Sequence, residues 1–214
     1  RFFMIGILDD QAIPENTTAD GPSAMWHPPA LVEGCTLLSR AAASRWCWWH
    51  LPTPPARNTS LAALIEDEPT GVTWHTPAET QYLLDMMTDV NRKKVDAARQ
   101  TGERVVGTIY RRTRTGPDGI KRQRAEVRFD QIAGCLRTAA GGSSRQTIMV
   151  VDGQSVRSRL LSTREAAALM GLPDTYILPT RYNEAYKLAG DGGAVPVVRH
   201  LAETIFEPVL RCNR

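Results

Sequence analysis

The sequence lacks the features that would place it in a membrane, in a secretory pathway, or among redox or zinc-ribbon proteins. No apolar run approaches the ~18 residues that a membrane span needs, and no signal peptide is visible. The four cysteines form no Cys-x-x-Cys pair, which argues against a redox motif or a zinc ribbon. These absences predict a cytoplasmic protein with reduced thiols and no membrane partner.

A metal site remains an alternative at one place in the chain. Cys47 and His50 follow Cys35 and His27, and all four are residue types that bind zinc. Their spacing is irregular, so buried thiols and surface imidazoles are the favoured interpretation. We therefore expect no metal.

The chain as a whole carries only a small excess of positive charge. The 214 residues carry a net charge of +3, with 42% hydrophobic and 23% charged residues, which predicts a packed core in one large domain or two small ones. Arg1 cannot be a translation start. We therefore expect a trimmed chain, a processed product or a subunit.

Apolar periodicity and turn residues predict both strands and helices. The apolar run Arg1–Leu8 is typical of a strand buried on both faces of a parallel sheet, and residues 9–30 are typical of a linker. Residues 146–151 predict a further strand. The aromatic segment 46–49 predicts either a strand packed into a core or a base-stacking platform.

Three helices are predicted from capping residues and apolar faces. The first begins with a capping box at Thr76 and Glu79 and is expected to run to Gly102. The second begins with a capping box at Ser162 and Glu165 and ends at Gly171. The third follows the glycine-rich turn 190–193. The apolar faces of the first and third helices consist of Leu83, Met86, Met87 and Val90, and of Val195, Val198, Leu201, Ala202, Ile205 and Val209.

The positive charge is concentrated in one predicted hairpin, residues 105–128, with its turn at 116–119. Between Arg104 and Arg128 there are eight Lys or Arg and two acidic residues, a net +6, so the remainder of the chain sums to −3. The two interpretations are a solvated ribbon face and a surface that follows phosphates. Arginine suits the second, because its fork donates two parallel hydrogen bonds to a phosphate or a guanine edge.

Four separated segments together resemble the DNA cytosine-5 methyltransferases, in that family's order. Residues 159–165 (Arg-Leu-Leu-Ser-Thr-Arg-Glu) with 169–174 (Leu-Met-Gly-Leu-Pro-Asp) are similar to the ninth motif of the family. Residues 185–192 (Ala-Tyr-Lys-Leu-Ala-Gly-Asp-Gly) are similar to the tenth, and residues 1–6 to the end of the eighth. Residues 132–136 and Gly141-Gly142 resemble the end of the target-recognition region. The sequence departs from the family pattern at Cys135, Asp191 and Gly193, where Thr, Asn and Val are usual.

The resemblance implies an α/β fold: the C-terminal fragment of a Rossmann-like S-adenosylmethionine-dependent methyltransferase domain, plus an α+β target-recognition region with β-hairpins. Residues 1–8 would end a strand of the catalytic domain, residues 9–155 would recognise the DNA target, and residues 156–214 would return to the catalytic domain. The implied reaction transfers a methyl group from S-adenosylmethionine to C5 of a flipped cytosine in double-stranded DNA, as in restriction–modification systems.

The resemblance also implies roles for individual residues. The cofactor pocket would be completed by Gly190, Asp191 and Gly192, and Arg1 would lie beside the flipped cytosine. The expected DNA-binding residues are Arg111, Arg112, Arg124, Arg128, Arg137, Thr138, Gly141, Gly142, Ser143 and Arg145.

The residues that carry out the reaction in this family are not found in the chain. The nucleophile is a cysteine that follows a proline, and no cysteine here follows a proline. The glycine-rich loop after the first strand is also missing. We expect both in an upstream catalytic portion of the same enzyme, and we expect this chain alone to be inactive. The alternatives are a DNA-binding module without a catalytic partner and one subunit of a split methyltransferase.

Overall fold

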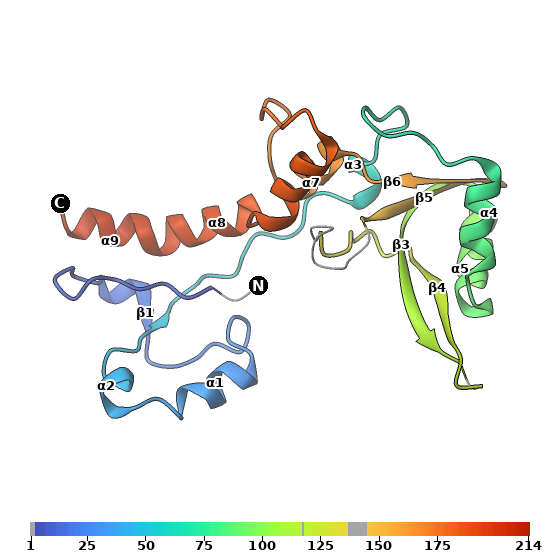
Figure 1. The fold of residues 1–214 in the computed structure, drawn as a ribbon. Helices are drawn as coiled ribbons and strands as arrows, with labels where there is room; N and C mark the ends of the chain where they lie inside the picture. Colours follow the sequence, from blue (N-terminus) through green and yellow to red (C-terminus); the bar gives the residue numbers. More distant parts are fainter. Residues whose placement is uncertain (1–2, 117, 137–144) are drawn as a thin grey trace. The chain divides into compact units, whose positions relative to one another are not determined.

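The computed structural model describes residues 3–116, 118–136 and 145–214, and it separates into two compact units. One unit is Arg57–Val195, and the other combines Arg1–Ala56 with Pro196–Arg214. Figure 1 shows the elements of both units, and each unit is described by itself below. Within the described residues, no helix is both long and apolar enough to cross a membrane.

The unit Arg57–Val195 is built on a four-stranded antiparallel sheet in the order β4-β3-β5-β6. The predicted basic hairpin is confirmed as β3 (Arg104–Thr115) and β4 (Lys121–Arg128), and the predicted strand at 146–151 is confirmed as β5 (Thr147–Asp152). A second hairpin joins β5 to β6 (Ser155–Leu160). In the turn of the basic hairpin, Gly119 has a φ of 75°, a conformation that favours glycine.

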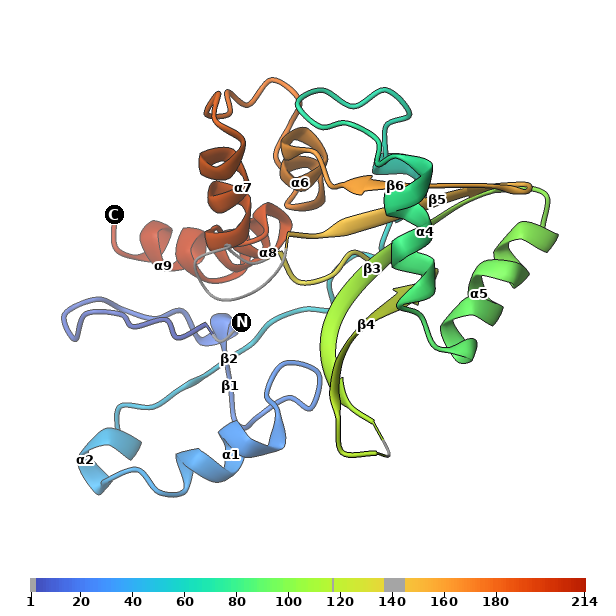
Figure 2. The same cartoon turned by 45° about the vertical axis from the view of Figure 1, so that its right-hand side comes forward.

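Helices cover both faces of this sheet, so the unit has three layers (Figure 2). Side chains alternate between the two faces along a strand. Met149 and Val151 pack against α4 (Pro77–Asp85) and α5 (Asp89–Gln100), whereas Ile148 and Val150 pack against the other face. The helices on that other face are α3 (Leu61–Leu64), α6 (Thr163–Leu169) and α7 (Tyr182–Asp191).

The helix predicted to begin at Thr76 does so, but it does not run to Gly102. The capping box of Thr76 and Glu79 is confirmed, and α4 ends at Asp85, after which α5 begins at Asp89. Because the break starts a new helical register, Val90 is 66% exposed rather than buried, and Val95 faces the core instead. Gly102, with a φ of 68°, follows the end of α5 as predicted.

A fully buried ion pair joins the sheet to α6. Arg159 on β6 donates two hydrogen bonds to the Glu165 carboxylate, at 2.8 and 2.6 Å, and both side chains have no exposed surface. Glu165 also accepts from the backbone amides of Ser162 and Glu66, each at 2.8 Å. Arg159 lies over the Trp74 ring, 4.8 Å from its centroid, and donates to the Glu66 carbonyl at 2.6 Å. The pair therefore fixes β6, the start of α6 and the segment after α3 together.

The second unit has little regular structure outside its helices. It contains η1 (Glu15–Thr17), α1 (Pro29–Cys35) and α2 (Arg40–Ala43), and β1 (Thr18–Ala19) pairs with β2 (Trp48–Trp49). The last helical segments are α8 (Val195–Leu201), η3 (Ala202–Phe206) and α9 (Glu207–Cys212), of which α8 starts at the boundary residue Val195. Ile205 and Val209 of the predicted apolar face are buried, but Val198 is half exposed.

The strand predicted for Arg1–Leu8 is wrong for the residues that are described. Residues 3–8 adopt no regular secondary structure, and Met4 and Leu8 are largely exposed. A buried parallel strand needs neighbours on both sides, and both sheets of the described chain are antiparallel. An apolar run alone could not show whether such neighbours were available.

The aromatic segment 46–49 packs against its own unit. The Trp46 and Trp48 rings meet edge to face at 5.4 Å, and His27 contacts Trp48 at 4.7 Å. Burial raises the pKa of the nearby Cys47 thiol. Among the described residues, no group of three or more His, Cys, Asp or Glu is placed to hold a metal ion.

The contacts divide the chain differently from the predicted functional segments. The predicted boundary between residues 155 and 156 falls inside β6, which pairs with β5 along its whole length. Residues 156–195 therefore pack with the four-stranded sheet, and Pro196–Arg214 groups with the N-terminal segment. The functional division remains a prediction.

We predict that Glu165→Gln destabilises the protein by about 3–5 kcal/mol, because it leaves the buried Arg159 guanidinium without a compensating charge. Chemical denaturation at pH 7 measures this free energy. Glu184→Gln is the matched control, since Glu184 is in an exposed ion pair with Arg181. Equal stability of the two variants would contradict a structural role for the buried pair.

The same pair predicts a pH dependence. Burial raises the pKa of Glu165, but the hydrogen bonds from Arg159 and from the amides of Ser162 and Glu66 outweigh it and lower the pKa below its usual value. The charged carboxylate therefore stabilises the fold fully above the unfolded pKa of about 4.3, and this contribution is lost as the pH falls through the folded value. The stability gap between wild type and Glu165→Gln should close over that acidic range.

Candidate functional site

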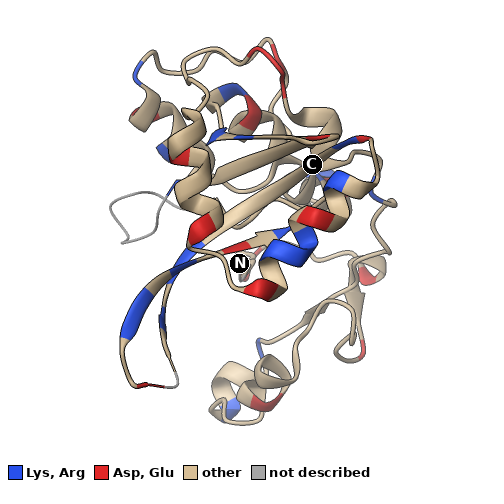
Figure 3. Cartoon of the chain, turned by 90° about the vertical axis from the view of Figure 1, so that its right-hand side faces the viewer, with Lys and Arg blue, Asp and Glu red and all other residues tan. Residues whose placement is uncertain are grey.

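The basic hairpin has two chemically different faces. Residues directly opposite each other on β3 and β4 share a face, and the pairs on one face are Arg112 with Arg124 and Arg114 with Arg122. Arg128, opposite Thr108, lies on the same face. We call this set the arginine face: Arg112, Arg114, Arg122, Arg124 and Arg128. Figure 3 shows the basic residues along the hairpin.

Acidic residues on and near this face neutralise it only in part. Glu126 lies 2.7 Å from Arg114 and 3.8 Å from Arg112. Asp118 pairs with Arg122 at 2.6 Å, and that hydrogen bond lowers the pKa of the Asp118 carboxyl, with help from the Ile120 amide. Arg128 pairs with Asp130, which lowers the pKa of that carboxyl and raises the pKa of the guanidinium. Five arginines thus face three carboxylates.

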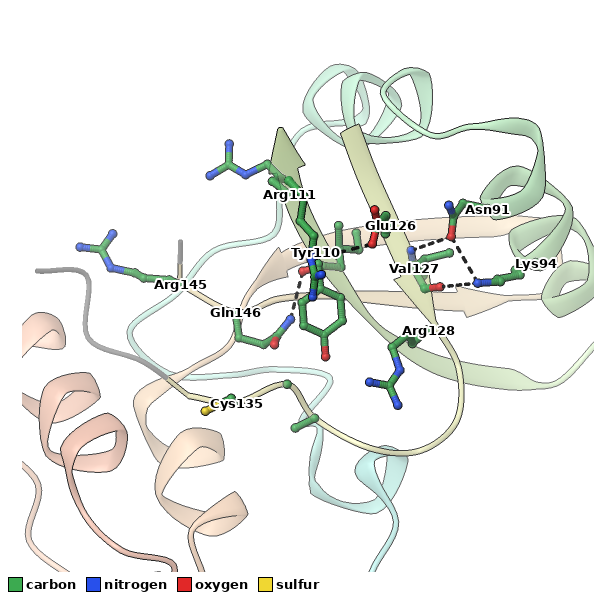
Figure 4. A pocket seen from close by; sticks show the side chains of 14 residues that line it. Asn91, Lys94, Tyr110, Arg111, Glu126, Val127, Arg128, Cys135, Arg145 and Gln146 are labelled. Carbon is green, nitrogen blue, oxygen red and sulfur yellow. Dashed lines mark hydrogen bonds and ion pairs between the residues drawn. The ribbon is translucent and has the colours of Figure 1, made fainter. Parts of the chain in front are cut away.

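A concave pocket of about 740 Å³ lies at the base of the hairpin (Figure 4). Its floor and walls come from β3, β4, α5, the segment 133–135 and the two residues that precede β5. The lining is mostly polar or charged and includes four residues of β3, Tyr110 among them. The residues are Asn91, Lys94, Ile109, Tyr110, Arg111, Arg112, Glu126, Val127, Arg128, Ala133, Gly134, Cys135, Arg145 and Gln146.

Gln146 organises the pocket from within the fold. Its side-chain amide donates to the backbone carbonyl of Ile109 at 3.1 Å, and its backbone carbonyl accepts from the Leu161 amide at 2.9 Å. Gly134 packs so closely beside it that a Cβ there would lie 2.3 Å from Gln146 Oε1 and 2.7 Å from the Tyr110 ring. Only glycine fits this position without moving Gln146 or Tyr110.

Helix α7 supports the same two residues that precede β5. The Tyr186 hydroxyl accepts a hydrogen bond from the Gln146 backbone amide at 2.9 Å. The Tyr182 ring lies 5.3 Å from the Arg145 guanidinium, and the Tyr182 hydroxyl donates to the Leu161 carbonyl at 2.7 Å. Burial raises the pKa of Tyr182 to about 12, so this ring is uncharged at neutral pH.

The structure brings several of the predicted DNA-binding residues together. Arg112, Arg124 and Arg128 share the arginine face, and Arg145 lines the pocket with two of them. Arg111 projects from the other side of β3 and also borders a second pocket beside α4. Strand alternation in the sequence could have separated Arg111 from Arg112. The remaining predicted residues lie outside the described part of the chain: Arg1, Arg137, Thr138, Gly141, Gly142 and Ser143.

The predicted cofactor residues lie elsewhere. Gly190 and Asp191 form the end of α7, and Gly192 follows it. None of the three lines the pocket on the hairpin. Tyr110, Gly134 and Gln146 were not identified from the sequence. Tyr110 carries a signal, since it alternates with Arg112 and Arg114 along the strand, whereas Gln146 carries none.

The chain matches the family model of the C-5 cytosine-specific DNA methylases over residues 1–207. Because this match spans nearly the whole sequence, the chain belongs to that family of methyltransferases, which confirms the resemblance seen in the motifs.

Three curated relatives are similar over a shorter stretch. Type II methyltransferase M1.ScrFI of Lactococcus lactis subsp. cremoris is 34% identical over 59 residues, which is 28% of this chain and 15% of the relative. M.SsoII of Shigella sonnei is 35% identical over 58 residues, 27% of this chain and 15% of the relative. M.MspI of Moraxella sp is 39% identical over 56 residues, 26% of this chain and 13% of the relative. Each match thus spans at most 15% of the relative's length.

We predict that Tyr186→Phe costs about 1–3 kcal/mol of stability, because the buried Gln146 amide loses its hydrogen-bond acceptor. Denaturant unfolding gives the free energy, and hydrogen exchange of the Gln146 amide should accelerate. Tyr82→Phe is the control, since Tyr82 is 60% exposed. If neither substitution changes the free energy of unfolding, the hydrogen bond between Tyr186 and the Gln146 amide does not stabilise the fold.

Proposed function

We propose that this chain is the DNA-reading part of a DNA (cytosine-5-)-methyltransferase. The parent enzyme would transfer a methyl group from S-adenosylmethionine to C5 of a cytosine flipped out of double-stranded DNA. The observation that carries the proposal is the arginine face, which continues into the polar pocket at the base of the hairpin.

The chemistry of this surface suits a nucleic acid. The arginine face offers planar guanidinium groups in cross-strand pairs, and such groups bind phosphate oxygens and guanine edges in two-pronged fashion. Like charges directly opposite each other in a sheet are unfavourable without a counter-charge. Arg112 and Arg124 form such a pair, and Glu126, which lies 3.8 Å from Arg112 and 2.7 Å from Arg114, balances their charge only in part. A polyanion that lies along the hairpin would supply the missing negative charge.

The pocket adds groups that could read base edges. Tyr110, Glu126 and Gln146 line it. Carboxylates accept from cytosine amino groups in the major groove. We infer that the hairpin places the DNA backbone and that the pocket contributes to selection of the target.

Gly190, Asp191 and Gly192 remain our proposed contribution to the S-adenosylmethionine pocket. The C-terminal end of a helix carries partial negative charge, and these residues stand at that end of α7. A carboxylate and helix carbonyl groups suit the cationic sulfonium and ammonium groups of the cofactor, which would supply the methyl group. Arg1 keeps its proposed place beside the flipped cytosine on the resemblance alone.

We predict that the chain binds duplex DNA weakly and with strong salt dependence. If about five basic groups contact phosphates, log K should fall with log salt at a slope of about −4 to −5. Arg124→Ala with Arg128→Ala should weaken binding and make the slope shallower by about 2. Fluorescence anisotropy across a salt series measures both.

The matched control removes the same charge from another surface. Arg92 and Lys93 are exposed on α5, which covers the opposite face of the sheet. Their double substitution by Ala should leave the slope close to that of wild type. Equal losses in the two double variants would mean that binding follows net charge, and the arginine face would lose its role.

We predict no methyl transfer by this chain alone, because none of its cysteines follows a proline as the family's nucleophile does. Labelled S-adenosylmethionine and mixed-sequence duplex test this, with an active type II cytosine-5 methyltransferase as the positive control. Label on cytosine above the blank without protein would refute the proposed division of labour.

A further inference from the structure

Arg145 is held differently from every arginine of the hairpin that forms an ion pair. Its guanidinium lies 5.3 Å from the centre of the Tyr182 ring and donates a hydrogen bond to Asn183 Oδ1. Both partners are electrically neutral. Arg114, Arg122 and Arg128 instead pair with carboxylates. No ion pair joins Arg145 to an acidic residue within the described parts of the chain.

This difference matters for an incoming anion. An arginine already paired with a carboxylate must share or exchange that partner before it neutralises a phosphate. A guanidinium that rests on an aromatic ring and an amide oxygen keeps its full charge, while its side chain gives up most of its freedom. Such a residue loses little further entropy when it binds.

The support under Arg145 is itself rigid. Tyr182 stacks on Tyr186, with ring centroids 5.8 Å apart, and its hydroxyl is bonded to the Leu161 carbonyl. Tyr186 holds the amide of Gln146, the residue next to Arg145. One helix therefore fixes the Arg145 side chain and the backbone beside it, at the rim of the pocket that Arg145 lines.

We propose that Tyr182 and Asn183 are positioning residues that hold Arg145 ready at the pocket for a phosphate of the DNA. The identity of the ligand rests on the proposed function, whereas the positioning of Arg145 does not. The helix whose end carries the tenth motif thereby also serves the DNA-reading surface, through its first turn.

The first test needs no DNA. In the NMR spectrum of the full chain, the Arg145 side-chain signal is the one that Arg145→Ala removes. Over an aromatic ring it should be shifted upfield in wild type and in Tyr182→Phe, which keeps the ring. In Tyr182→Leu it should move to the position of exposed arginines. An unshifted signal in wild type would overturn the inference.

The second test is a double-mutant cycle on duplex affinity. Tyr182→Leu should weaken binding by about threefold to tenfold, because Arg145 must then be ordered on binding. Tyr182→Phe should bind like wild type, although it also loses the bond to Leu161. In an Arg145→Ala background, Tyr182→Leu should change affinity by less than about twofold. Additive losses would overturn the inference.

Two further variants keep the outcomes separate. Asn183→Ala replaces Tyr182→Leu in the affinity cycle if the latter fails to fold, since Asn183 is exposed. Tyr82→Leu removes an exposed tyrosine from α4 and should leave affinity unchanged. If wild type binds no duplex, the proposed function fails, and the NMR signal alone decides whether Arg145 is positioned.

Discussion

Arg159 and Glu165 are both fully buried, and a buried charge is tolerated only when a partner of opposite charge and hydrogen bonds compensate for the lost water. Here the carboxylate closes the capping box of α6 and also binds the amide that follows α3. The ion pair thereby fixes the helical layer on one face of the sheet. Helix α7 packs in that layer and holds Gln146 and Arg145, so the geometry of the pocket depends on a fully buried pair of charges.

The strand β3 begins in the buried core and ends at the exposed surface. Its first half is buried between helices, and its last five residues are exposed in the projecting hairpin. Helices cover the sheet where β3 lies between β4 and β5, and the two-stranded end carries the arginines. A charged ribbon of this kind would be marginal alone. Its anchorage in a covered sheet lets the exposed end present like charges without unfolding.

Signals between residues close together in the sequence predicted much of this fold, whereas contacts between residues far apart in the sequence could not be predicted. The capping boxes at Thr76 and Ser162 and the basic hairpin were confirmed, because their determinants lie within a few residues. Arg159 and Glu165 lie in one motif of the sequence, but nothing in that motif shows that the two residues form a buried ion pair or that Arg159 lies over the distant Trp74 ring. The apolar run of residues 1–8 predicted a strand that the described residues 3–8 do not form, because its sequence could not show which neighbours it would have. The place of Gln146 in the pocket depends on Tyr186, 40 positions away.

We propose that the arginine face and its pocket form the DNA-contact surface of this unit. Backbone NMR of the full chain, titrated with a short duplex at low salt, can locate that surface residue by residue. We predict chemical-shift changes concentrated at residues 110–114, 122–128, 133–135 and 145–146, with α4 and α5 largely unperturbed apart from the pocket residues Asn91 and Lys94. Shifts centred on α4, on the exposed side of α5 or on the tryptophans of the other unit, with the hairpin unchanged, would contradict it.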